Sequence, residues 1–269
     1  MDIINCNYYI CDGVISSKEF SEELVTSKGV TLYEVIRVIK GVPLFIEEHL
    51  ERLESSAKLT NITLKYDNLE IKRQIKLLIE KNKVLEGNVK IIFNHDDKDN
   101  FYAYFIKHKY PTEEMYIKGV ETILYHGERE TPNAKVINKT FRKKVDERIA
   151  AAGVFEAILV DDNGNITEGS KSNIFMVKGK GIITAPIKDV LPGVTRNIII
   201  KLVKSLNFNV IEKNINYKDI FKMDAVFITG TSPKVLPISK IDETNFISTK
   251  NAIVIKIISE YDNLIAFMI

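Results

Sequence analysis

The sequence has no tryptophan, two cysteines and four histidines among its 269 residues. Cys6 and Cys11 lie close together near the amino terminus, so their spacing allows a disulfide between them. Two cysteines make no disulfide framework, however, and a reducing compartment fits them better. The histidines are scattered through the chain and offer no metal-ligand spacing: His49, His95, His108 and His126. We therefore expect no metal site.

Long apolar runs and blocks of one charge are absent as well. The longest apolar stretch is far below the roughly 20 residues that span a bilayer, and the amino terminus does not resemble a signal peptide. The 38 basic and 36 acidic residues leave a net charge of +2, with no basic face for nucleic acid or for a scaffolding role. These absences predict a cytoplasmic protein that binds neither nucleic acid nor membranes.

The residues that are present predict a mixed α/β chain of two domains. An apolar content of 45% with 28% charged residues is ordinary for a globular protein. Strand patterns at 31–39, 89–93 and 101–106 surround two amphipathic helices at 46–59 and 69–83. A charged segment around Pro111 then predicts a linker. The expected domains are residues 1–110 and 116–269, joined by a linker at 111–115.

The stretch from Phe155 to Arg196 is the most informative part of the chain. It predicts strands at 155–160, 166–168, 173–177 and 181–184, with an Asp-Asp-Asn-Gly turn after the first. Glu168 stands alone among small polar residues, which suits a place where a ligand approaches the backbone. The Leu-Pro-Gly-Val-Thr-Arg segment then opens a helix whose first N–H groups can bind an anion.

These residues carry a resemblance. ITEGSKSNIF followed by LPGVTR is similar to the signature of the class IV, fold-type IV, pyridoxal-phosphate (PLP) enzymes. That family includes branched-chain and D-amino-acid aminotransferases and aminodeoxychorismate lyase. The resemblance implies an α/β (α+β) fold with a small amino-terminal α/β domain and a larger carboxyl-terminal pseudo-barrel domain. It also implies PLP in the cleft between them and a homodimer.

Lys135 is the candidate for the amine that forms the Schiff base with PLP. It precedes the helix expected at 139–152 and stands among small and apolar residues. Desolvation there favours the neutral, nucleophilic form of an amine. The residues alone also allow an ordinary lysine at a strand end. The resemblance selects Lys135, because the family has a K-x-x-N pattern one helix ahead of a G-x-x-E-A-I/L strand, as in 135–138 and 153–158.

The other cofactor contacts also follow from the resemblance. Glu168 matches the glutamate that keeps the PLP ring nitrogen protonated, although by itself it reads equally as a turn glutamate in water. Arg52, in HLERLESSAKL, matches the arginine that binds the phosphate, a task suited to a guanidinium fork. Alone, Arg52 reads as a solvated helix charge. The resemblance assigns further phosphate contacts to Val194, Thr195 and Thr231, and Arg196 is expected to be structural.

The substrate-binding residues are less constrained. Tyr33 matches an aromatic residue of the family pocket, and Glu34 beside it is expected to be structural. Phe93, Ser172 and Ser232 are candidates by position. The family's carboxylate-binding arginine has no counterpart in the segment 91–95, which leaves two cationic candidates, Lys90 and His95. Phe93 would favour an apolar substrate side chain.

The resemblance predicts an aminotransferase that moves an amino group between an amino acid, branched-chain or otherwise apolar, and a 2-oxo acid. The main alternative is 4-amino-4-deoxychorismate lyase, which uses the same lysine and cofactor and releases pyruvate and 4-aminobenzoate. A protein that binds PLP without catalysis is a further alternative. The identity of the amino acid, and its L or D configuration, stay open because these motifs are shared.

Overall fold

The computed structural model describes residues 7–17, 29–96 and 99–269. Its internal contacts divide the chain into two units. Unit 1 comprises Met1–Lys109, Ala134–Ile137 and Met268–Ile269, and unit 2 comprises Tyr110–Asn133 and Asn138–Phe267. The sequence-based division at 110 placed Lys135 in the second domain. The contacts instead assign the short segment around Lys135 to unit 1, because it pairs with a strand there.

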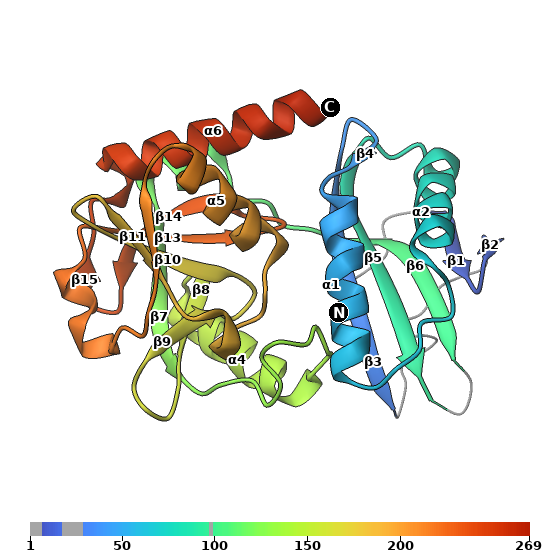
Figure 1. Ribbon diagram of the computed structural model, residues 1–269, viewed down its shortest axis with the longest axis horizontal. Coiled ribbons are helices and arrows are strands. Elements are labelled where there is room, and N and C mark those ends of the chain that lie inside the picture. The colour runs from blue at the N-terminus through green and yellow to red at the C-terminus, as the bar shows by residue number, and fades with distance from the viewer. Residues whose placement is uncertain (1–6, 18–28, 97–98) are drawn as a thin grey trace. The chain divides into compact units, whose positions relative to one another are not determined.

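Unit 1 is built on a six-stranded sheet in the order β2-β1-β6-β5-β3-β4, in which every neighbouring pair is antiparallel. The strands are labelled in Figure 1, and their bounds are β1 Tyr9–Cys11, β2 Val14–Ser16, β3 Val30–Ile39, β4 Val42–Pro43, β5 Glu86–His95 and β6 Asn100–Ile106. The register of β3 on β5 extends without interruption over ten residue pairs. This long pairing makes β3 a rigid support for the segments that pair with it.

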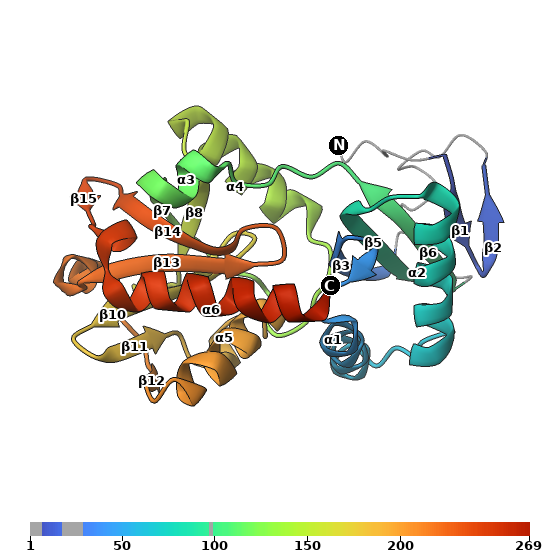
Figure 2. The same cartoon turned by 90° about the horizontal axis from the view of Figure 1, so that it is seen from above.

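Two helices cover one face of this sheet, α1 (Ile46–Leu59) and α2 (Asn68–Asn82), as Figure 2 shows. Alternate residues of β3, such as Leu32 and Ile36, pack with α1 and α2 residues such as Leu50 and Ile75 in one buried cluster. The helical spacing of these apolar side chains explains why both segments form helices. The predicted helices at 46–59 and 69–83 are thus confirmed to within a residue at their ends.

Unit 2 contains a nine-stranded curled sheet in the order β12-β11-β10-β13-β14-β7-β8-β9, with β15 paired to β14. The strands are β7 Val120–His126, β8 Glu156–Val160, β9 Ile166–Gly169, β10 Asn173–Lys178, β11 Gly181–Thr184, β12 Asn209–Glu212, β13 Ala225–Gly230, β14 Lys234–Ile241 and β15 Thr244–Asn245. Isoleucine and valine side chains from these strands form its core. The sheet confirms the predicted strands between 155 and 184.

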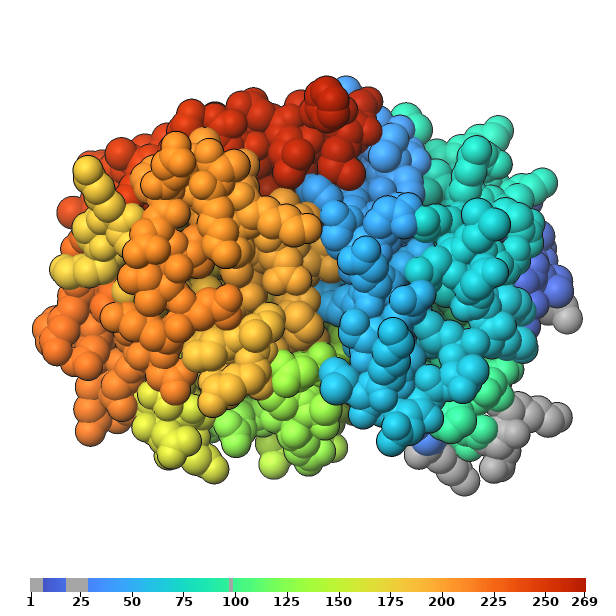
Figure 3. Space-filling view, viewed as in Figure 1, coloured from blue at the N-terminus to red at the C-terminus, as the bar shows by residue number. Residues whose placement is uncertain are grey.

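The helices of unit 2 are α3 (Glu113–Lys118), α4 (Lys139–Ala152), α5 (Val194–Ser205) and α6 (Ala252–Met268), with 3-10 turns η2 Ile187–Asp189, η3 Tyr217–Lys222 and η4 Ser248–Lys250. Figure 3 shows α6 in red on the surface beside the orange residues that include α5. In the described part of the chain, no helix is both long enough and apolar enough to cross a membrane.

Helix α3 and strand β14 are the longest elements that the sequence-based prediction lacked. Helix α3 begins inside the segment expected to be a linker, because Thr112 caps it by accepting a hydrogen bond from Met115 N–H. Strand β14 was not predicted, since Pro237 interrupts its pattern. Pro237 nevertheless lies within the β13–β14 register, opposite Phe227.

Candidate active site

The backbone around Lys135 is held by hydrogen bonds within unit 1. Tyr33 N–H donates to the Lys135 carbonyl (3.2 Å) and Ile137 N–H donates to the Thr31 carbonyl (3.0 Å), so the segment forms an antiparallel bridge on β3. From the other side, Lys135 N–H donates to the Ser56 hydroxyl of α1 (3.1 Å). The peptide that carries this lysine is therefore fixed by both the sheet and the helix.

The side chain of Lys135 lies over an aromatic ring. Its Nζ is 4.5 Å from the ring centroid of Tyr33, and the Lys90 Nζ is 5.8 Å from the same centroid. An aromatic face attracts cations through its quadrupole. The structure thus brings together two predicted site residues, Lys135 and Tyr33, and adds Lys90 as a second cation at the same ring.

Arg52 is not the solvated helix charge that its position alone allowed. It is 8% exposed, and its Nε and Nη2 donate to the two oxygens of Glu34 at 2.7 and 2.6 Å. His49 Nδ1 lies 2.7 Å from Glu34 Oε2, and Nδ1 is the donor because a carboxylate only accepts. His49, Arg52 and Ser56 recur at helical spacing, so one face of α1 serves both Glu34 and Lys135.

Burial and the neighbouring charges both shift the pKa values of Glu34 and His49. Burial raises the pKa of Glu34, but the Arg52 guanidinium and the His49 hydrogen bond outweigh it and hold that pKa at about 2. Burial lowers the pKa of His49, and the nearby Arg52 and Lys135 charges lower it further against the opposing effect of Glu34. Glu34 is therefore an anion and His49 is neutral near pH 7.

Phe93 and Tyr33 point to opposite faces of the unit 1 sheet. Phe93 pairs with Leu32, is 1% exposed and belongs to the core under α1 and α2. Tyr33 pairs with Ile92 on the other face. Strands alternate their side chains, so the β5 residues on the Tyr33 face include Lys90 and Ile92. The position of Phe93 favours a packing role over contact with a substrate.

Glu168 is a buried carboxylate in unit 2, at 3% exposure. Leu191 N–H donates to its Oε2 at 3.2 Å, and Asn173 Nδ2 lies 3.5 Å from the same oxygen. Arg129 Nε lies 3.1 Å from Oε1, which makes an ion pair. Asn173 also donates to the Leu191 carbonyl (2.9 Å), so the strand end and the turn before α5 hold the carboxylate together.

The start of α5 has the features of an anion site. Gly193 precedes the helix without a side-chain cap, and both Val194 and Thr195 are 4% exposed. The first N–H groups of a helix lack intrahelical acceptors and carry partial positive charge. A Cβ on Gly193 would collide with Asn173 Oδ1, so only glycine allows the turn to approach β10 this closely.

Thr229 supplies an unpaired hydroxyl on the face of the unit 2 sheet that also carries the Asn173 side chain. Its Oγ1 is buried and has no hydrogen-bond partner among the described residues. Thr229 is the cross-strand neighbour of Asn173, so both side chains point to one face. A buried hydroxyl without a partner is costly unless a ligand completes it. Together with the uncapped helix start, it fits the phosphate of PLP.

Two serines predicted to bind substrate differ in their surroundings. The Ser172 hydroxyl donates to Glu156 Oε2 (3.1 Å), and Glu156 also accepts from Lys171 N–H and the Ser170 hydroxyl. Glu156 thus holds the turn that follows Glu168, and Ser172 serves that turn. Ser232 lies with Thr231 in the partly exposed turn between β13 and β14.

Arg129 is the residue that sequence reasoning missed. It lies in the polar loop before Lys135, where nothing distinguishes it from other surface arginines. Its Nη2 donates to the Ser170 carbonyl (2.9 Å), which Arg142 also reaches (2.8 Å). Arg196, expected to be structural, donates to the Ala185 carbonyl and pairs with Glu212.

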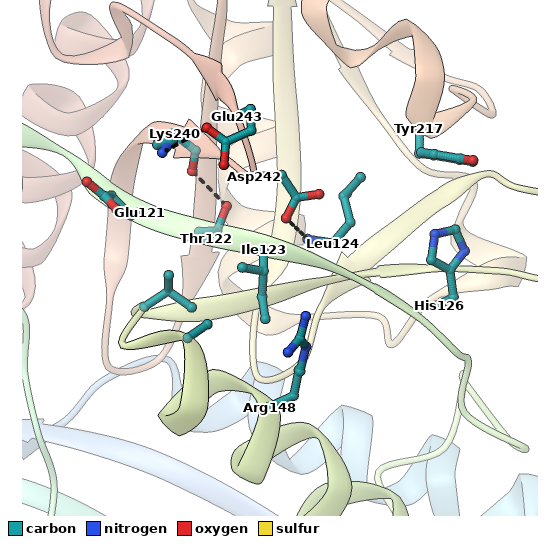
Figure 4. Close-up of a pocket in the computed structure, with 12 residues that line it drawn as sticks. Glu121, Thr122, Ile123, Leu124, His126, Arg148, Tyr217, Lys240, Asp242 and Glu243 are labelled. Atoms are coloured by element: carbon teal, nitrogen blue, oxygen red, sulfur yellow. Dashed lines mark hydrogen bonds and ion pairs between the residues drawn. The ribbon is translucent and has the colours of Figure 1, made fainter.

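A separate open hollow of about 540 Å³ lies elsewhere on unit 2 (Figure 4). Thr122 donates to the Lys240 carbonyl there, and Asp242 accepts from Leu124 N–H. Most of its charged side chains face solvent, and none of the predicted site residues lines it. Its lining is Glu121, Thr122, Ile123, Leu124, His126, Arg148, Ala152, Val154, Tyr217, Lys240, Asp242 and Glu243.

Comparisons with known proteins identify relatives of this chain. D-alanine aminotransferase of Bacillus licheniformis is 30% identical over 227 residues, which are 80% of each chain. The branched-chain amino acid aminotransferase structure of Escherichia coli aligns with a TM-score of 0.87 and 23% identity, over 97% of this chain and 95% of that one.

The branched-chain amino acid aminotransferase of T.th., complexed with N-(5'-phosphopyridoxyl)-L-glutamate, aligns with a TM-score of 0.87 and 22% identity, over 99% of this chain and 96% of that one. These two structures show the fold. The family model for amino-transferase class IV matches residues 31–241. The chain therefore belongs to the class IV aminotransferases, a PLP-dependent family.

Proposed function

We propose that this aminotransferase binds PLP and uses it to exchange an amino group between an amino acid and a 2-oxo acid. When bound, PLP supplies an aldehyde that bonds amines and a protonated ring that accepts electrons. The observation that carries the proposal is Glu168, a buried carboxylate held by a backbone N–H, an amide and an arginine. Such a carboxylate stabilises a proton on a ring nitrogen.

Lys135 is the proposed catalytic amine. Its amine would hold PLP at the aldehyde carbon and would move the proton at the substrate Cα. The two hydrogen bonds that fix its peptide and the Tyr33 ring beneath its ammonium group support this role, because they limit where Nζ can reach. An oriented base within reach of its proton is what proton transfer requires.

The phosphate is assigned to Arg52, to the N–H groups of Val194 and Thr195 with the Thr195 hydroxyl, and to Thr231. The orphaned hydroxyl of Thr229 adds a further donor on the same sheet face as Asn173. A phosphate is bound by several hydrogen-bond donors. The N–H groups at a helix start and the guanidinium of an arginine are donors that suit it.

For the substrate we propose Tyr33, Lys90 and Ser232 as pocket residues. Lys90 replaces the missing arginine as the cation for a carboxylate, because it lies beside the Tyr33 ring, whereas the exposed His95 pairs with Asp99. The relatives act, by name, on branched-chain amino acids and D-alanine. An apolar side chain on the donor is consistent with both.

A donor screen tests the function. The protein, supplied with PLP, is assayed with L- and D-amino acids, including leucine, valine, glutamate and alanine, against 2-oxoglutarate and pyruvate. We expect turnover with at least one apolar donor, and no turnover with any pair would end the proposal. Borohydride reduction should trap a covalent adduct in the wild type but not in Lys135→Ala. Persistent labelling of that variant would show that another lysine is the amine.

The lyase alternative is separated by one assay. A lyase releases pyruvate from 4-amino-4-deoxychorismate without an added 2-oxo acid, whereas an aminotransferase needs the second substrate. The relatives and the family model favour transfer. We also propose a cytoplasmic homodimer, on the basis of the resemblance. Light scattering of the purified protein would give a mass of about 61 kDa, twice that of the 30.7 kDa chain.

A further inference from the structure

A second buried carboxylate, Glu34, lies in unit 1 and has no role in the proposed chemistry. It is 0% exposed, in the middle of β3, and each of its oxygens accepts from the Arg52 guanidinium. His49 adds a third short hydrogen bond to Oε2. Burying a carboxylate costs free energy unless hydrogen-bond donors compensate for the lost water. A buried ion pair of this kind can also fix the orientation of the charged side chain that it contacts.

The geometry of the ion pair restricts Arg52 severely. Glu34 engages Nε and Nη2, which together form one edge of the planar guanidinium. Two parallel bonds on one edge fix both the direction and the plane of the fork. The direction of the remaining nitrogen, Nη1, then follows from the plane of the fork. A long, flexible side chain thereby becomes a rigid donor.

The same strand also fixes the Lys135 peptide. Tyr33, adjacent to Glu34, donates its N–H to the Lys135 carbonyl, and Ser56, one turn after Arg52 on α1, accepts from Lys135 N–H. Two neighbouring residues of β3 and one face of α1 therefore hold both the arginine and the lysine. This framework consists of a paired strand and a packed helix, the most rigid parts of the unit.

We propose that Glu34, supported by His49, is a positioning residue for the cofactor phosphate: it orients Arg52 so that the guanidinium is pre-organised for the phosphate while β3 holds Lys135 for the aldehyde. This inference rests on the proposed function. Glu34 does not touch the cofactor. Its contribution is to the affinity for the phosphate group, because an oriented guanidinium loses less side-chain entropy on binding.

The test compares PLP with pyridoxal, which has the aldehyde but no phosphate. Dissociation constants of both are measured by absorbance titration of cofactor-free wild type and Glu34→Gln. A glutamine cannot accept from both Arg52 nitrogens and His49 at once. We expect the PLP constant to rise at least about tenfold and the pyridoxal constant to stay within about twofold. At saturating PLP, kcat should remain within about threefold of wild type.

Matched variants separate positioning from a general loss of structure. Glu70→Gln removes another glutamate that forks an arginine in unit 1, but on the surface of α2, so it should change neither constant. In an Arg52→Lys background, Glu34→Gln should no longer alter the ratio of the two constants, because the fork is gone. Thermal unfolding of each cofactor-free variant reports whether it is folded.

Each result decides the question. Equal weakening of PLP and pyridoxal would show that Glu34 merely supports the fold, and unchanged PLP binding would show that Arg52 needs no positioning. Either result overturns the inference and leaves the proposed function intact. If wild type binds neither compound, the proposed function fails first and this inference with it. Should Glu34→Gln not fold, Glu34→Asp is measured instead, with the same expected rise, because its shorter side chain cannot reach both nitrogens.

Discussion

The two units each bury one glutamate, and the two carboxylates are held in different ways. Glu34 in unit 1 receives three contacts of 2.6–2.7 Å from charged or imidazole donors. Glu168 in unit 2 has contacts of 3.1–3.5 Å to Arg129, Leu191 N–H and Asn173. Short charge-assisted bonds immobilise a carboxylate, whereas longer ones leave it able to share its charge with a ligand. The difference supports a structural role for Glu34 and the proposed chemical role for Glu168.

Replacing Glu168 by glutamine should have the largest effect on catalysis. A neutral amide cannot hold a proton on the ring nitrogen, so kcat should fall about 10²–10³-fold. The fold should change little, because the glutamine oxygen still accepts from Leu191 N–H. Steady-state rates with the best donor test this, with Glu34→Gln as the contrasting variant. A kcat within tenfold of wild type would remove the chemical role of Glu168.

A smaller loss is expected when Arg129 is replaced by methionine. Arg129 is the cation beside Glu168, and without it the carboxylate takes up a proton more readily. We expect kcat to fall about tenfold, less than for Glu168→Gln, because the carboxylate itself remains in place. Arg142→Met is the control, because Arg142 reaches the Ser170 carbonyl but pairs with Asp146 instead of Glu168. Equal losses in both variants would contradict the assignment.

The stability of unit 1 should depend on pH through Glu34. Its pKa is lowered from 4.5 to about 2, so its stabilisation is present above pH 4.5 and is lost as the pH falls toward 2. His49, whose pKa is lowered by burial, acts in the same direction from about pH 6.5 downward. Urea unfolding should show a loss on the order of 2 kcal/mol between pH 5 and pH 3, and Glu34→Gln should flatten this slope.

The smallest effect is expected from the exposed counterpart of the Glu34–Arg52 pair. Glu70 contacts Arg73 through two bonds of 2.7 Å on the surface of α2. Solvent screens such a pair, so Glu70→Gln should leave the free energy of unfolding nearly unchanged. A large change in chemical denaturation would mean that the fork geometry shared by the two pairs, and not burial, sets their contribution to stability.

Local patterns predicted much of both units. The helices α1, α2 and α4 and the strands from β8 to β11 follow directly from apolar periodicity, caps and turn residues. The motif around Glu168 identified the family, which the class IV match confirms. Strand β14 escaped because a proline lies in it, and α3 because a short capped helix of six residues resembles a charged linker.

The roles of Glu34 and Arg129 were not visible in the sequence for a different reason. Glu34 is 18 positions from Arg52, and Arg129 is 39 positions from Glu168. No periodicity connects residues at such separations, since helical and strand repeats relate only near neighbours. Phe93 shows the same limit: which face a strand residue takes depends on what covers each face of the sheet.

The amino-acid sequence by itself determined the class of enzyme and the candidate lysine, glutamate and helix start, through its resemblance to a known family, and most of the helices and strands, through local spacing. Only the tertiary structure decided that Ala134–Ile137 joins the first unit, that Arg52 is buried on Glu34, and that Arg129 pairs with Glu168. The physical reason is that charge pairing and desolvation act through space, and the chain must fold before distant groups share one low-dielectric environment.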